Sequence, residues 1–225
     1  MFKLWPWLEA NKNRLIGVGV AVLVLWAVWY FVTTQKAERE VKAGQELTQL
    51  LMSPPAGVNA PDALSQFASK YSGTVAAQRA QLQAAASLFG MGKYPEAQAA
   101  FEKFLQNSPG GALAATAQLG VGASLEAQGK NDLAAVAYQK TASTYSTTPS
   151  ALPALCALGR LAEQAGKLSE ALGHYENAAR AGQAGGSLAQ EAAMRAAEIK
   201  TKLPAQKSVS AVTPAPAAAT VAPAK

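Results

Sequence analysis

Hydrophobic residues are distributed along this chain in two different ways. Eighteen consecutive residues from Leu15 to Val32 carry no charge. After about residue 60, apolar and small residues instead recur at helical spacings among charged ones. A helix of 18 residues is about 27 Å long, close to the ~30 Å hydrocarbon thickness of a bilayer. The pattern predicts an all-α protein, with a transmembrane helix over 15–34 followed by a helical domain over 35–203.

Aromatic residues flank the uncharged run on both sides. Trp5 and Trp7 precede it, and Trp26, Trp29 and Tyr30 lie near its far end. Such placement is typical of the two interfaces of a membrane. A cleaved signal peptide is the alternative, but its apolar region is shorter and ends in small residues. The sequence therefore favours a permanent anchor over a cleaved signal.

The charges that flank the run do not decide its orientation. The side of a membrane helix that carries more Lys and Arg residues near its end usually lies in the cytoplasm. Here three such residues lie on each side. The two sets are Lys3, Lys12 and Arg14 before the run, and Lys36, Arg39 and Lys42 after it.

A Gly-Lys pair recurs at residues 92, 129 and 166, a constant interval of 37. Each time, an Ala follows the Gly by five residues and an aromatic residue follows that Ala by four. Gly tolerates the left-handed conformation that ends a helix, and small residues allow two helices to cross closely. The residues involved are Ala97 with Phe101, Ala134 with Tyr138 and Ala171 with Tyr175, opposed by the small residues Ala85, Gly122 and Gly159.

The interval predicts three helix–turn–helix units over about 78–111, 115–148 and 152–185. The segment before them, 37–74, is interpreted as a degenerate unit, because Ala63 and Phe67 repeat the spacing from Ala to aromatic. After the units, 187–202 has the pattern of an amphipathic helix and is expected to cap the array. The Pro- and Ala-rich tail 204–225 lacks helical periodicity and is expected to be disordered.

These units resemble the tetratricopeptide repeat, whose paired helices repeat every 34 residues. The resemblance implies a solenoid whose first helices line a concave groove that binds other proteins. Carried over to this chain, the inward positions are Arg79, Leu82, Phe89, Leu119, Glu126, Cys156, Arg160, Glu163 and Gln164. For three of them, Leu82, Leu119 and Cys156, packing between units is an equal alternative to binding. The expected groove is apolar at one end and charged at the other.

The chemistry of the chain does not point to catalysis. His174 is the only histidine, and no Asp or Cys lies at ligand-like spacing from it, so a solvated helix residue is expected. Cys156 is the only cysteine and excludes an intrachain disulfide. Gly120 and Gly122 form a G-x-G inside a helical pattern, which favours close packing over phosphate binding. We expect no enzyme activity, cofactor, metal or small-molecule substrate.

The net charge of +6 does not indicate nucleic-acid binding. Residues 1–60, 61–203 and 204–225 each contribute two excess positive charges, so no segment concentrates them. Proteins that bind nucleic acid usually carry a basic stripe. We therefore expect partners to be other proteins and, through 15–34, the lipid bilayer.

The anchor resembles a more specific family. A polar N-terminus with the run Trp7-Leu8-Glu9-Ala10-Asn11-Lys12 precedes one apolar span and a domain of repeats. This combination resembles the YfgM-like ancillary subunits of the SecYEG translocon. The resemblance implies a bacterial inner-membrane protein, with residues 1–14 cytoplasmic and the repeats periplasmic, that binds translocon subunits or periplasmic chaperones. An anchored scaffold for outer-membrane, cell-wall or division complexes is the alternative.

Overall fold

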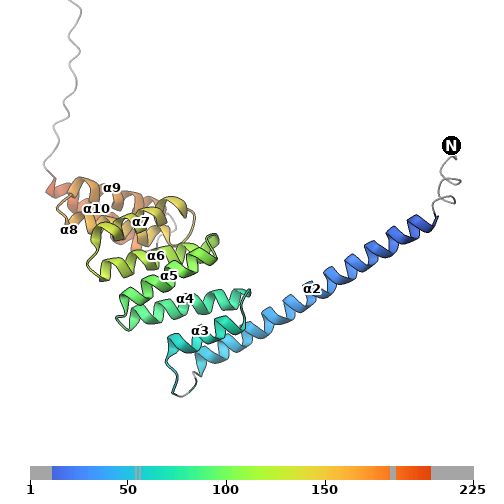
Figure 1. Ribbon diagram of the computed structural model, residues 1–225. Helices are drawn as coiled ribbons and strands as arrows, with labels where there is room; N and C mark the ends of the chain where they lie inside the picture. Colours follow the sequence, from blue (N-terminus) through green and yellow to red (C-terminus); the bar gives the residue numbers. More distant parts are fainter. Residues whose placement is uncertain (1–11, 54, 56, 183–185, 204–225) are drawn as a thin grey trace, which may run out of the picture.

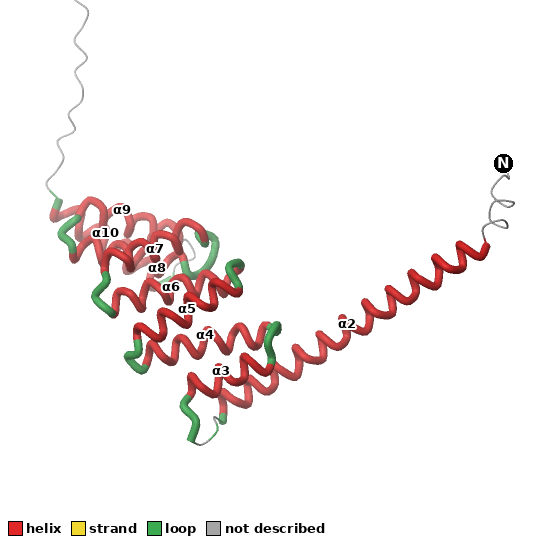
Figure 2. Tube along the Cα trace, viewed as in Figure 1, coloured by secondary structure: helices red, strands yellow, loops and turns green. Residues whose placement is uncertain are grey.

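The structure is a computed structural model that describes residues 12–53, 55, 57–182 and 186–203. The expectations for Trp5, Trp7 and the tail 204–225 therefore lie outside the described residues. Within the described ranges the chain forms nine helices and no strand, joined by short loops (Figure 2). The helices are α2 (Lys12–Met52), α3 (Ala60–Lys70), α4 (Val75–Gly90), α5 (Tyr94–Asn107), α6 (Gly111–Ala127), α7 (Asn131–Thr144), α8 (Ala151–Gln164), α9 (Leu168–Ala181) and α10 (Ser187–Lys202).

The helices after α2 stack in chain order into one elongated array (Figure 1). Each helix packs against the helix before it and the helix after it. In addition, α2 contacts α4, and α4 contacts α6, so these first helices of successive pairs lie along one side. The last helix, α10, packs on both α9 and α8. This arrangement confirms an all-α solenoid of the tetratricopeptide type.

The helix α2 is longer than the sequence predicts. The sequence predicts a transmembrane helix over 15–34 and a degenerate unit that starts at residue 37, but the span and the first helix of that unit form one helix of 41 residues. The physical reason is the absence of a breaker, since no Pro occurs between residues 12 and 52. The hydroxyl of Thr33 donates to the carbonyl of Tyr30, so a polar group in the junction is satisfied within the helix. A helix of this length spans about 60 Å.

The apolar part of α2 packs against no other part of the described chain. In Figure 1 this part of the helix projects away from the array. Leu23 is 65% exposed and Phe31 is 64% exposed. By length and composition, α2 is the one helix in the described residues that is able to cross a membrane.

The three Gly-Lys turns have the expected conformation. Gly92, Gly129 and Gly166 have φ angles of +76°, +74° and +73°. At the first turn the N–H of Lys93 donates to the carbonyl of Leu88 over 3.0 Å, and equivalent bonds follow the other two glycines. This bond pattern is the Schellman motif, which pairs carbonyls at the end of a helix. The predicted role of glycine in these turns is confirmed.

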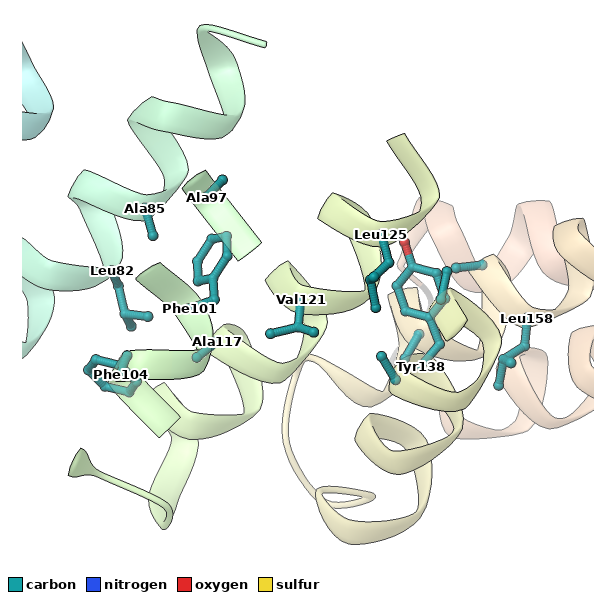
Figure 3. Close-up of a cluster of buried hydrophobic side chains, with 14 of the residues drawn as sticks. Leu82, Ala85, Ala97, Phe101, Phe104, Ala117, Val121, Leu125, Tyr138 and Leu158 are labelled. Carbon is teal, nitrogen blue, oxygen red and sulfur yellow. The ribbon is translucent and has the colours of Figure 1, made fainter. Parts of the chain in front are cut away.

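The small residues lie where the two helices of a unit cross. Ala97, Ala134 and Ala171 are each 0% exposed. Phe101 lies with Ala97 and Ala134 in the largest apolar cluster, which runs through the first two units and into α8 (Figure 3). Ala171 lies with Tyr175 in a separate cluster at the end of the array. The crossing positions predicted from the interval of 37 are therefore buried helix contacts.

Glycines in the facing helices make room for the aromatic rings. A Cβ added to Gly122 would lie 2.6 Å from the ring of Tyr138. A Cβ added to Gly159 would lie 2.8 Å from the ring of Tyr175. A Cβ added to Gly120 would lie 2.6 Å from the ring of Phe101, which belongs to the preceding unit. The G-x-G pattern is confirmed as a packing feature.

The far part of α2 is fixed to the α3–α4 turn by two neighbouring side chains. Arg39 donates from Nη2 to the carbonyl of Lys70, at the end of α3, over 3.1 Å. The carboxylate of Glu40 accepts from the N–H groups of Val75 and Ala76, at the start of α4, over 3.1 and 3.2 Å. Each charge matches the dipole of the helix end that it contacts. These bonds join α2 to the repeat array.

Candidate functional site

A groove of about 790 Å³ lies between α2, α4 and α6. We call it the concave groove. Its walls come from the first helices of successive pairs, and Phe101 of α5 lies at its floor. The lining residues are Glu40, Gly44, Leu47, Thr48, Leu51, Val75, Ala76, Arg79, Leu82, Gln83, Ala86, Phe89, Phe101, Leu113, Thr116, Leu119, Gly120 and Ala123.

The concave groove is mainly apolar. Leu51 is 54% exposed at its edge, and Val75 is 47% exposed. Among the described lining residues, the charged side chains are Glu40 and Arg79. Glu40 is occupied by the N-terminus of α4, whereas Arg79 is exposed and forms no ion pair within the described part of the chain. The groove thus offers an apolar surface with one available positive charge.

Four of the residues predicted for the groove lie together in it. Arg79, Leu82 and Phe89 line it from α4, and Leu119 lines it from α6. Leu82 is only 8% exposed and also belongs to the core, as the packing alternative expects. Phe89 is half-buried, and its ring centre lies 5.2 Å from that of Tyr94. The other five predicted positions lie outside this groove: Glu126, Cys156, Arg160, Glu163 and Gln164.

Two of those five, Glu126 and Arg160, form an ion pair between α6 and α8. The guanidinium contacts both carboxylate oxygens of Glu126, and the hydroxyl of Tyr138 donates to Oε2 over 2.8 Å. Arg160, and to a lesser degree the Tyr138 hydrogen bond, hold the pKa of Glu126 below its usual range, although burial acts in the opposite direction. The pair connects adjacent units and leaves Arg160 half-exposed, with 47% of its side chain accessible.

Glu163 has the equivalent position in the next unit. The hydroxyl of Tyr175 donates to its Oε2 over 3.3 Å. Burial, with the Glu163 charge, raises the pKa of Tyr175 to about 12. Gln164 lines a separate pocket of about 280 Å³ that His174 and residues of α7 also line. The structure therefore gives Glu163 a hydrogen-bond partner within its own unit and places Gln164 outside the concave groove.

The two residues singled out for possible chemistry lie in ordinary helix positions. Cys156 is half-buried against the last apolar cluster, and burial raises the pKa of its thiol. His174 is half-buried, with Nε2 3.9 Å from a carboxylate oxygen of Glu170 in the same helix. Within the described residues, no group of three His, Cys, Asp or Glu side chains is placed to hold a metal ion.

The wall of the groove formed by α2 was not identified from the sequence. Gly44, Leu47, Thr48 and Leu51 line it. The Gly-Lys turns align the other units with one another. This segment lacks such a turn, so the alignment does not show which of its residues face inward. The signal that remains is the spacing of Gly44, Leu47 and Leu51, which places the three on one face of a helix.

Comparison with known proteins agrees with this architecture. A family profile described as a tetratricopeptide repeat-like domain matches residues 6–205. No curated protein matches the sequence significantly. Among solved structures, a chain described as MamA 41-end from Desulfovibrio magneticus RS-1 is similar with a TM-score of 0.50 and 17% identity, covering 73% of this chain and 92% of that one. A chain described as MamA RS-1 ArsTM double mutant gives 0.48 and 15%, covering 73% and 96%.

Proposed function

Because this chain belongs to the tetratricopeptide repeat-like domain family, we propose that it is a membrane-anchored module that binds a segment of another protein in its concave groove. The fold is typical of protein-interaction modules rather than of catalysis. The groove is the observation that supports the proposal most strongly. It combines about 790 Å³ of space with exposed or half-buried apolar side chains on three helices.

The chemistry of the groove indicates the kind of segment that it accepts. Leu51, Phe89 and Leu119 present apolar surface that favours burial against apolar side chains of the partner. Arg79 is the available cation at this surface. Arg and aromatic residues often contribute most of the energy of an interface. We infer a partner segment with apolar side chains on one face and a carboxylate opposite Arg79.

The proposed anchor is the apolar part of α2. Its exposed residues, including Leu23 and Phe31, require a nonpolar environment that the described chain does not supply. Since α2 continues without a break into the repeats, the groove would lie close to the membrane surface. Partners embedded in or emerging at that membrane are therefore favoured.

The resemblance of the anchor to YfgM-like proteins supports a more specific proposal. In this proposal the protein is in a bacterial inner membrane, residues 1–14 are cytoplasmic and the repeat domain is periplasmic. It assists protein translocation or transfer to chaperones at the Sec translocon. A scaffold for outer-membrane, cell-wall or division complexes uses the same groove and is distinguished by the partner recovered.

Site-specific photocrosslinking in intact membranes tests the groove. A photoreactive amino acid at Phe89 or Leu119 is expected to capture a partner, which mass spectrometry identifies. Leu133 is a matched control, because it is an exposed apolar residue on α7, 57% exposed and not among the groove residues. Capture from Leu133 but not from the groove positions would show that another face binds. Recovery of translocon subunits supports the first specific proposal, and recovery of envelope-assembly proteins supports the scaffold.

Proteolysis of spheroplasts tests the orientation. With the repeats in the periplasm, protease added outside is expected to digest the domain after about Thr33. Protection of the domain in spheroplasts, with digestion only after lysis, would contradict the proposed orientation.

A further inference from the structure

A second pocket, of about 620 Å³, lies where the apolar part of α2 ends. We call it the juxtamembrane pocket. Phe31 and Val32 form its apolar end. Its other end carries four cations, Lys36, Arg39 and Lys42 from α2 and Lys70 from α3. Two consecutive helices, α2 and α3, therefore supply one basic site.

The cations lie at a definite depth relative to the apolar run. With a rise of about 1.5 Å per residue, Lys36 is about 6 Å beyond Val32 and Arg39 about 10 Å beyond it. A typical bilayer adds about 5–8 Å of headgroup region to each side of its hydrocarbon core. When Val32 marks the edge of the hydrocarbon, Lys36 therefore lies within the headgroup region, and Arg39 lies just beyond its outer limit.

The charges of the pocket are only partly neutralised by the protein. Glu38 is the carboxylate that lines it. Lys70 pairs with Glu46 over 2.8 Å, and one guanidinium nitrogen of Arg39 is used by the carbonyl of Lys70. Within the described residues, Lys36 and Lys42 are exposed and form no ion pair. The pocket thus retains an excess of positive charge next to an apolar surface.

We propose that the juxtamembrane pocket binds the phosphate headgroup of an anionic phospholipid, with an acyl chain along Phe31 and Val32. The inference rests on the proposed membrane anchor and deepens it. A lipid matches the site in both of its parts, because it combines a negative headgroup with an apolar chain at the depth where the pocket changes from apolar to basic. Lipid bound there contacts both α2 and α3 and orients the repeat array relative to the membrane.

The test uses the full chain in detergent micelles, titrated with phosphatidylglycerol or phosphatidylcholine, with bound lipid counted by native mass spectrometry. Phosphatidylglycerol is expected to bind more tightly. The double variant Lys36→Gln/Lys42→Gln is expected to lose about fivefold in phosphatidylglycerol affinity for each cation removed. The matched control is Lys103→Gln/Lys140→Gln, which removes two exposed cations from α5 and α7 and is expected to bind like the original chain.

Four further results decide the inference. Equal affinities for the two lipids, or equal losses in the variant and the control, would overturn it. Inorganic phosphate that competes with phosphatidylglycerol at equal concentration would show a free anion site and also overturn it. Flotation with liposomes of pure phosphatidylcholine separates the two proposals. A chain that floats but does not discriminate between lipids refutes only the headgroup site, whereas one that does not float refutes the anchor and the site with it.

Discussion

The hydroxyl of Tyr138 donates a 2.8 Å hydrogen bond to the carboxylate of Glu126, twelve residues earlier in the chain. The same relation recurs in the next unit, where Tyr175 donates to Glu163. In the first unit the corresponding positions, 37 residues before Tyr138 and Glu126, are Phe101 and Phe89. Hydroxyl and acceptor are thus present together or absent together. In the second and third units the acidic residue therefore links the two helices through a hydrogen bond. In the first unit Phe89 makes no such bond and instead lines the concave groove.

Removing the hydroxyl of Tyr138 is expected to destabilise the repeat domain. Tyr138→Phe should lower the free energy of unfolding by about 1 kcal/mol, because a hydrogen bond is lost while Arg160 continues to pair with Glu126. Tyr175→Phe removes a longer bond, of 3.3 Å, and should cost less. Urea denaturation of residues 36–203 measures both. A greater loss in Tyr175→Phe would contradict this account of the pair.

The pH dependence of stability should reflect Glu126. Arg160 lowers the pKa of Glu126 in the folded state below the ordinary value of 4.5. The ionised carboxylate therefore contributes stability above about pH 4.5, and this contribution is lost as the pH falls through the folded pKa. Glu126→Gln is expected to be less stable at neutral pH and to lose less stability on acidification. Urea denaturation at a series of pH values measures this, and an acid slope in Glu126→Gln equal to that of the original chain would contradict the role of this carboxylate.

Two glycine substitutions should have opposite effects. Gly122→Ala places a Cβ 2.6 Å from the ring of Tyr138, and overpacking of this kind costs about 1–3 kcal/mol. Gly173→Ala, in the middle of α9, meets no atom within 4 Å and should stabilise the domain by about 0.5–1 kcal/mol. Thermal unfolding followed by circular dichroism compares the two. Equal shifts in the same direction would show that the aromatic ring does not limit the space at Gly122.

Glu40 should stabilise the junction between α2 and the array. Its carboxylate accepts from two N–H groups at the start of α4, so Glu40→Ala is expected to cost about 0.5–2 kcal/mol, as removal of a helix cap does. Glu38→Ala is the matched control, because Glu38 is exposed two residues away. Hydrogen exchange at the first amides of α4 reports the effect locally. Unchanged exchange in Glu40→Ala would contradict the capping role.

The local pattern of the sequence determined the repeat and its close helix crossings. A constant interval of 37 between Gly-Lys pairs fixed which Ala and which aromatic residue face the partner helix. The structure confirms this in the buried Ala97 and in the positive φ of Gly92. These features depend on residues within one or two helices, where spacing alone defines which side chains share a face.

The tertiary structure decided which side chains meet across units. Arg160 and Glu126 are 34 residues apart, and Lys70 and Glu46 are 24 apart, so their pairing depends on how successive helices stack. The sequence placed Glu126, Arg160 and Glu163 on inward positions but did not reveal that other side chains of the protein occupy them. Likewise, the α2 wall of the concave groove and the juxtamembrane pocket exist because α2 continues unbroken and is bound by Arg39 and Glu40 to the α3–α4 turn. Helical periodicity identifies a face, whereas the rotation and separation of neighbouring helices determine what that face contacts.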